Sequence, residues 1–471
     1  QIAAMETEDF AKLNTDAVAA LTTAQVKALT SAQIKAFSTN QIASIGTDQI
    51  AALSFSQVRA IETADLVMLK DEQLQAMSAA SVAALDTEQL SKLTSDQFAA
   101  LTTSQIRALT LDQVKVISTA QASQMSTAQV AAMTGFQTET LQTSVLANLT
   151  PDALGAITAA NITALTSSQL SAFTTDMVSQ LGNTQVTSLR AAQINGFSSN
   201  QLNALSTAQV RSLSNTQIAG LNATVMTQLA EEQVNSLTAS QAGAITTSNI
   251  AVLKTQQVQA LSTAAVAGLS TSQIAAMKAD QIAALTTSQV KALSTAQLVA
   301  VTTEQASKLT ADQLAALNVT QLTAMQTADI AALSTAAIAN LPAAQLKNFT
   351  TAQINAITTA QSAVLTAEQI SSLTTTQMAN FNMSNFVTLS AEQIGALSTT
   401  NIASLNNNQL TFMTTTQIPA LTTSQIRAFS AAQITALRSD QLNVLTAEQI
   451  TALTIGQKAA LTAAGKTLPE V

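Results

Sequence analysis

The chain has 471 residues, no Cys, His, Trp or Tyr, and a net charge of −8, with 47% apolar but only 10% charged residues. The missing residues exclude disulfides, thiolate nucleophiles, zinc fingers and histidine acid–base catalysis. The negative charge argues against nucleic acid as a partner, and no apolar run has the 18 or more residues of a membrane span.

An eight-residue repeat runs through the chain from Met5 onward. Stepping by eight from Met5 to Leu461 gives 58 positions, all of them apolar, without an insertion or deletion. The consensus of this octad is Leu-Thr-Thr-x-Gln-Ile-x-Ala, whose places we number 1 to 8, and Leu21–Ala28 is a clean copy. The unbroken register predicts one continuous array over residues 1–464, followed by an irregular end at 465–471.

Each octad is predicted to form one very short capped helix. A continuous helix would rotate its apolar stripe by about 80° per octad, and the pattern lacks the alternation of a strand. Thr at place 2 and Gln at place 5, such as Thr22 and Gln25, have the spacing of a capping box, in which each side chain bonds the other residue's backbone N–H. Of the 27 acidic residues 17 occupy place 4, and 12 of the 19 basic residues occupy places 7 and 8, as a helix dipole favours.

Helices this short are not stable alone, so they must pack on one another. We expect places 1 and 6 and part of place 8 to form the core, and places 3, 4 and 7 to face solvent. Identical units joined identically form a superhelix, so the predicted fold class is all-α, a solenoid with one short helix per octad. The handedness and the number of octads per turn stay open. For the Gln at place 5, the capping box is the favoured role, and ladders of Gln side chains between coils are the alternative.

Three stretches depart most from the consensus: residues 135–161, 222–232 and 378–387. In the last of them Phe381, Met383 and Phe386 crowd together. This group is a candidate contact segment for a partner, but local filling of the core by bulky side chains is the interpretation that we favour. The first residue occupies place 5 of an octad, so we expect a fragment, a processed chain or a window on a longer array.

No catalytic, cofactor or metal site is predicted, and an enzyme is not expected. Ser and Thr are abundant, but no His or thiolate is present to activate them. Neighbouring carboxylates such as Asp71 and Glu72 fall at predicted helix starts, where they stabilise the helix dipole. A weak calcium site at such pairs and ice binding by rows of Thr are lesser alternatives.

The octad resembles the tandem repeats of very long bacterial secreted or cell-surface proteins of the adhesin and matrix-filament type, over residues 5–464. The resemblance implies an extracellular or cell-surface location, a structural or adhesive role and no catalytic residues. We therefore expect a self-associating component of a filament, stalk, sheath or matrix fibre. The alternative is a rigid spacer of a cell-surface adhesin, which presents a binding tip to a cell-surface or matrix partner.

Overall fold

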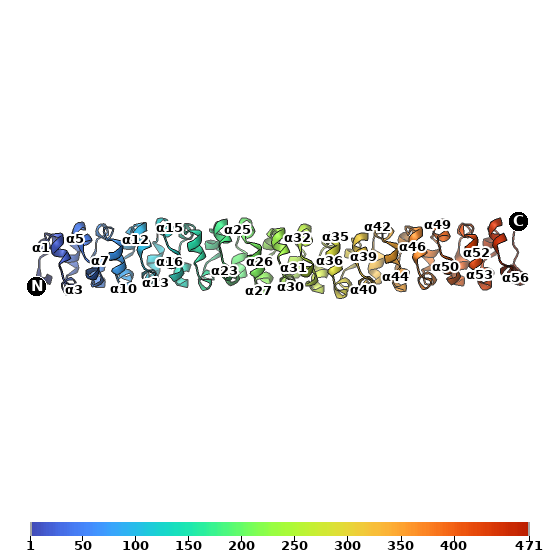
Figure 1. Cartoon of the computed structure of the whole chain (residues 1–471), viewed down its shortest axis with the longest axis horizontal. Helices are drawn as coiled ribbons and strands as arrows, with labels where there is room; N and C mark the ends of the chain where they lie inside the picture. Colours follow the sequence, from blue (N-terminus) through green and yellow to red (C-terminus); the bar gives the residue numbers. More distant parts are fainter. Residues whose placement is uncertain (1, 470–471) are drawn as a thin grey trace. The chain divides into compact units, whose positions relative to one another are not determined.

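The computed structural model describes residues 2–469, which contain 56 α-helices, two 3-10 helices and no strand (Figure 1). The α-helices run from α1 (Thr7–Ala11) to α56 (Ile455–Ala463), and all except α56 have four to six residues. Each begins at octad place 3, and all except α56 end at places 6 to 8. The predicted all-α array with one short helix per octad is confirmed.

Two extended residues, at places 1 and 2, turn the chain from one helix into the next. Before α13 (Thr103–Ala108), Leu101 has φ −59° and ψ 136°, and Thr102 has φ −69° and ψ 159°. The Thr102 hydroxyl accepts a hydrogen bond from the Gln105 backbone N–H at 3.3 Å, and Gln105 Oε1 accepts one from the Thr102 N–H at 2.8 Å. This reciprocal pair is the capping box that the sequence predicts.

Loss of one cap should have a modest local cost. Thr102→Ala removes the hydroxyl acceptor but keeps the bond to the Thr102 N–H, so we expect α13 to lose about 1 kcal/mol, the usual contribution of an N-cap. Hydrogen exchange of the α13 amides in the full chain measures this loss. Thr103→Ala, at the exposed place 3, is the control, and an equal loss there would contradict the capping role.

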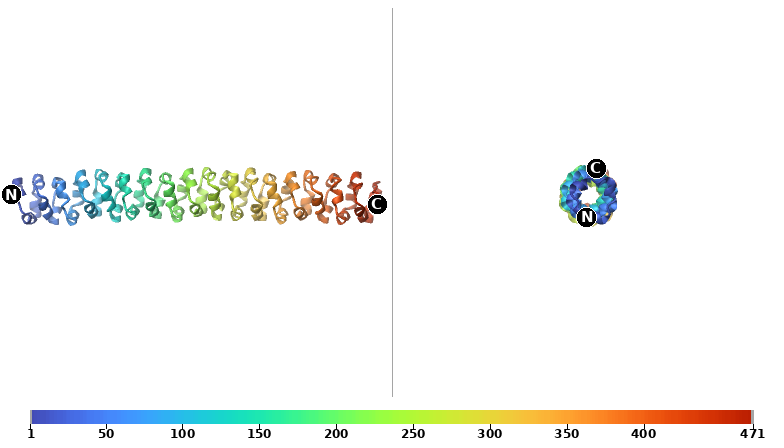
Figure 2. Two further views of the ribbon diagram at one scale, coloured as in Figure 1. Left: turned by 90° about the horizontal axis from the view of Figure 1, so that it is seen from above. Right: turned by 90° about the vertical axis from the view of Figure 1, so that its left-hand side faces the viewer.

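The described chain divides into two compact units, one up to Ser236 and one from Leu237 onward. In sequence, the octad register passes through this boundary without a change. Within each unit the helices follow one another around a common axis, as the two views of Figure 2 show. Each unit is therefore a solenoid of the same repeating element.

One turn of the solenoid, which we call a coil, takes between three and four octads. Within each unit, most helices pack on the helix three octads further along the chain, as α10 (Ala79–Ala84) packs on α13. The side chain of Gln105 in α13 reaches further back, to the carbonyl oxygens of Leu74 in α9 (Asp71–Ala76) and of Met77, which is 28 residues away. The start of one helix therefore lies against the end of a helix four octads earlier.

The core of each coil is formed by places 1, 5 and 6. Around α13, Leu109, Gln105 and Ile106 are 5%, 1% and 1% exposed. Places 2, 3, 4 and 7 are mostly exposed, and place 8 is mostly half-buried or exposed. The expected core at places 1 and 6 is confirmed, but that expectation left out the Gln at place 5, which is buried in almost every octad that has it. A buried amide needs hydrogen-bond partners for its polar atoms.

Proline and the end of the array account for local departures from this pattern. Pro419 lies at place 7, and its octad forms a turn and the 3-10 helix η2 (Ile418–Ala420) because Pro lacks the N–H that an α-helix needs. Helix α56 runs on through Leu461 instead of bending there, and the chain leaves it at Gly465, whose φ is +69°. Of the predicted irregular end, residues 465–469 are not helical, and 470–471 lie outside the described residues.

Candidate functional site

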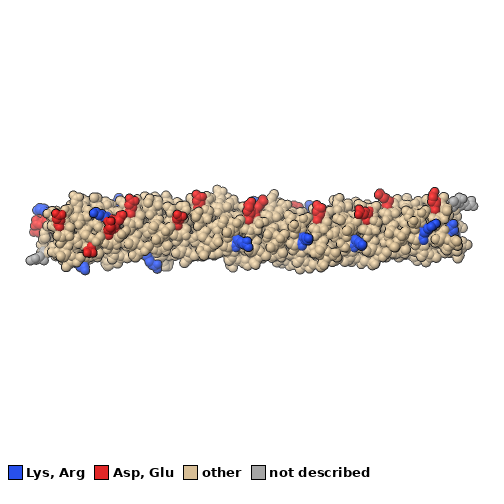
Figure 3. Space-filling view, in the orientation of Figure 1, with Lys and Arg blue, Asp and Glu red and all other residues tan. Residues whose placement is uncertain are grey.

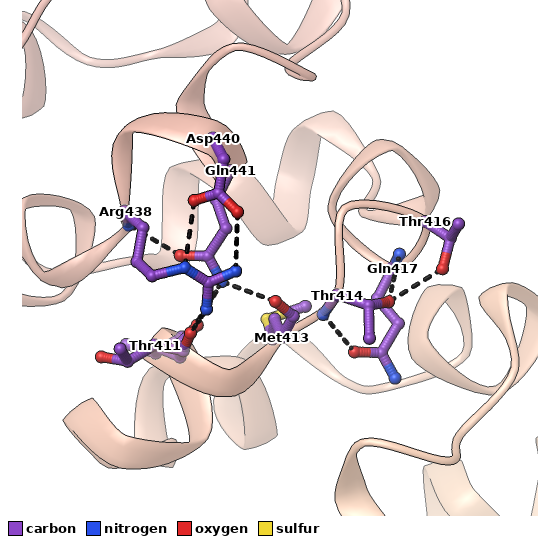
Figure 4. Close-up of polar contacts among 9 residues, drawn as sticks. Thr411, Met413, Thr414, Thr416, Gln417, Arg438, Asp440 and Gln441 are labelled. Carbon is purple, nitrogen blue, oxygen red and sulfur yellow. Dashed lines mark hydrogen bonds and ion pairs between the residues drawn. The ribbon is translucent and has the colours of Figure 1, made fainter.

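The amide of Gln at place 5 is the most regular polar feature of both units, and Figure 4 shows it for Gln441. Gln441 Oε1 accepts a hydrogen bond from the backbone N–H of Arg438 at 2.7 Å, as in a capping box. Gln441 Nε2 donates to the carbonyl oxygens of Leu410 and Met413, one coil earlier, at 2.8 and 2.7 Å. The side chain is 0% exposed. One amide therefore caps a helix and links two coils. We call the hydrogen bonds from Nε2 of a Gln at place 5 to carbonyl oxygens of the preceding coil the Gln tie.

The same arrangement recurs along the chain. Gln201, in the first unit, donates to the carbonyl oxygens of Leu170 and Phe173, both at 2.8 Å. The acceptors typically occupy places 6 and 1, at 31 and 28 residues before the Gln. The favoured capping role is thus confirmed, whereas the alternative of Gln side-chain ladders is wrong, because the amides bond backbone carbonyls of the preceding coil.

The residue types found at place 5 already indicate that its side chain donates hydrogen bonds between coils. Gln occupies place 5 in 42 of the 58 octads, and Glu occupies it in none. A capping box accepts Glu as well as Gln. A Glu carboxylate, however, has no hydrogen to donate to a carbonyl oxygen. The absence of Glu therefore indicates a place where a hydrogen-bond donor is favoured.

Asn at place 5 makes a weaker version of the tie. Asn161 donates to the carbonyl oxygen of Met133 at 2.7 Å, and Asn401 donates to that of Leu373 at 3.0 Å. Each of these acceptors lies 28 residues earlier, at place 1. Because Asn is one methylene shorter than Gln, its amide reaches this nearer carbonyl only.

Two buried carboxyl groups replace the amide elsewhere. Asp65 and Asp329 occupy place 5 and are 4% and 2% exposed, and Oδ2 of Asp329 has no hydrogen-bond partner among the described residues. By register, each carboxyl lies on the side where Gln would donate to the preceding coil. Burial raises the pKa of both carboxyls; nearby Glu62 raises the pKa of Asp65 further, whereas the backbone N–H of Gln326 partly offsets the rise at Asp329.

Asp329→Gln should stabilise the array near neutral pH. Because the pKa of Asp329 is raised in the folded chain, its protonation favours folding, so stability should fall as pH rises from about 4, the unfolded Asp value, through the raised pKa. The Gln side chain supplies the missing donor, and we expect a gain of about 1 to 3 kcal/mol at pH ~7 together with loss of this pH dependence. Hydrogen exchange of α41 (Thr327–Ala332), corrected for intrinsic rates, measures both effects.

Asp9→Gln is the matched control for this substitution, because Asp9 occupies place 5 but its side chain is 64% exposed. We expect little change in stability at Asp9. An unchanged or destabilised Asp329→Gln chain would show that the carboxyl of Asp329 is not opposed by the carbonyls of the preceding coil.

The structure separates the three residues of the candidate contact segment. Phe381 and Phe386 are 3% and 0% exposed, and only Met383 is half-buried. Met383 and Phe386 are the first and last residues of α48 (Met383–Phe386), and Phe381 lies in the bend before it. Core filling therefore accounts for the two Phe residues, and Met383 alone has surface that a partner could reach.

Only 10% of the residues are charged, and on the face drawn in Figure 3 the acidic and basic side chains lie singly or in small groups. Asp71 and Glu72 lie exposed in the first turn of α9, as their helix-start interpretation predicts. The guanidinium of Arg438 bonds both carboxylate oxygens of Asp440 at 3.0 and 2.9 Å and holds the pKa of that carboxyl below its usual range. The described residues contain no group of three or more acidic side chains suited to a metal ion.

Large apolar side chains are exposed at a few isolated positions, with exposed fractions of 55%, 74%, 57% and 90% for Phe55, Phe136, Phe412 and Ile455. An enclosed cavity in the second unit is lined by core residues, among them Val301 and Met325, and carries no titratable group. Among the described helices, none combines the length and the hydropathy needed to cross a membrane.

Comparison with known proteins identifies the repeat. The family model described as the ALTTAQ repeat matches just over half of the chain, at residues 2–39, 32–60, 58–95, 250–287, 322–359, 386–423 and 418–455. No curated protein matches the chain. A solved structure described as "Structure of APUM23-GGAAUUGACGG" aligns with 98% of this chain and 93% of that chain at 11% identity. Its TM-score of 0.13 is too low to indicate a shared fold.

Proposed function

We propose that this chain, a member of the ALTTAQ repeat family, is a non-catalytic structural protein whose repeat array itself performs the structural role. In this proposal it forms or contributes to a filament, stalk, sheath or matrix fibre outside the cell or at the surface of a bacterium. The observation that carries the proposal is the Gln tie, which repeats the same contact from coil to coil in each unit. An array held by nearest-neighbour contacts can grow by whole octads without a new kind of interface.

The character of the outer surface supports self-association as part of this function. Only 10% of residues are charged, and the net charge of −8 is spread over 471 residues, so repulsion between neighbouring chains is weak. The exposed rings of Phe55, Phe136 and Phe412 supply apolar area that contact with a second chain would remove from water. The acidic balance speaks against a nucleic-acid partner.

Electron microscopy of the purified chain at near-physiological ionic strength tests the proposal. We expect fibres of uniform width, and fewer fibres from a variant in which Phe55, Phe136 and Phe412 are all replaced by Ser. Circular dichroism of that variant should be unchanged, because these rings lie largely outside the core. Persistent single particles would overturn the filament proposal and favour a rigid spacer that carries the binding tip of an adhesin.

A further inference from the structure

Helix α18 (Thr143–Leu146) lacks the Gln tie to the coils on both of its sides. Place 5 of its octad is Val145, so no place-5 amide reaches back to the preceding coil. Place 5 of the octad 32 residues later is Met177, so no amide reaches from there to the carbonyl oxygens of Leu146 and Leu149. Along the 58 octads this is the one pair at that spacing in which both Gln residues are missing.

The start of α18 is also weakly held. Its N-cap residue, Gln142, makes no side-chain cap bond, and Gln142 Nε2 instead donates to the carbonyl oxygen of Lys115 in the preceding coil, at an exposed position. The next two octads add little, because place 5 is Ala153 in one and Asn161, with its single bond to Met133, in the other. Apolar burial, rather than the hydrogen bonds of place 5, holds this coil closed.

We infer that the array yields first at α18 when it is loaded or destabilised, and that it extends from there coil by coil. Side-chain hydrogen bonds between coils span 25 to 31 residues, so opening one coil breaks contacts with its immediate neighbours and leaves the others intact. Each opened coil releases about 28 residues, or roughly 100 Å of extended chain.

This inference adds extensibility to the proposed function. A filament or stalk built from such arrays would lengthen under tension at a defined point while the rest of each unit stays wound. That the array carries tension in a filament or stalk rests on the proposed function, whereas the order in which its coils open does not.

Thiol labelling of the full chain tests the order of opening, because the chain has no native Cys. Val145→Cys reports on α18, and Val225→Cys is the matched control. Both Val residues occupy place 5 in the first unit and are 1% and 2% exposed. The control octad is capped, since the Asn222 side chain accepts a hydrogen bond from the Val225 N–H at 2.9 Å. In mild denaturant we expect labelling at position 145 to be at least tenfold faster, and equal or reversed rates would overturn the inference.

A Gln tie restored between the octad of Met177 and α18 should stabilise the coil that contains α18. Met177→Gln in the Val145→Cys background completes a capping box with Thr174, which already caps this helix, and places an amide opposite the carbonyls of Leu146 and Leu149. We expect labelling to slow several-fold. Ala265→Gln in the same background is the control; it adds a Gln beside the cap residue Ser262 in the second unit and should leave the rate unchanged. No slowing by Met177→Gln would also contradict the inference.

Stretching single chains then tests the extension. We expect successive steps of about 28 residues, whereas release of a whole unit in one step would contradict coil-by-coil opening. Rapid labelling at position 145 in a chain that never forms fibres would overturn the filament proposal alone, so the two failures can be told apart.

Discussion

Gln105→Glu is expected to unfold the coils around α13 at neutral pH. The Glu side chain keeps the oxygen that caps Thr102, but it places a carboxylate against the carbonyl oxygens of Leu74 and Met77, which accept from Gln105 Nε2 at 2.8 Å each. A buried charge without a partner costs about 3 to 5 kcal/mol. Hydrogen exchange of the α9 and α13 amides in the full chain measures this loss.

Gln25→Glu is the matched control, because Gln25 is exposed and, among the described residues, its side chain bonds only Thr22. Glu caps a helix as well as Gln does, so we expect a change of no more than ~0.5 kcal/mol. Lowering the pH to about 4 should restore part of the stability of the Gln105→Glu chain, because a protonated carboxyl can donate to a carbonyl. Equal losses at Gln25 and Gln105 would show that place 5 serves the cap alone.

Phe386→Ala is expected to cost about 3 to 5 kcal/mol, because it leaves a cavity at a side chain that is 0% exposed. Faster hydrogen exchange of α48 and of α45 (Thr359–Ala363), which packs on it, measures the effect. Met383→Ala, at a half-buried position of the same helix, is the control and should cost much less. A partner contact at Phe386 would give the opposite result, with binding lost and the fold unchanged.

The local part of the structure could be predicted from the sequence because it depends on neighbouring residues. The spacing of Thr22 and Gln25 defines the cap and hence the helix start. The octad places also anticipate the burial of Phe381 at place 1 and Phe386 at place 6, and the partial exposure of Met383 at place 3. At that segment, the octad place was a better guide than the crowding of bulky side chains.

The packing of one coil on the next could not be predicted in the same way. The number of octads per turn depends on the backbone angles of the two extended residues in each bend, such as Leu101 and Thr102, and the repeat pattern does not encode these values. The tie made by Gln105 was missed because its capping role already explained the spacing. The exclusion of Glu from place 5 was the available signal, and its meaning depends on knowing that the amide is buried.

The 28-residue reach of the Gln tie also bears on how a gene for such an array can change. A duplication or deletion of whole octads re-forms equivalent pairs with new neighbours, because 42 of the 58 octads offer the same Gln donor and all offer backbone carbonyls at places 6 and 1. A shift of one to seven residues would instead misplace about four consecutive ties, since each amide near the shift would meet the wrong carbonyls. A change in length by whole octads therefore keeps the register of the ties, whereas a shorter insertion would break it, and the 58 octads carry none.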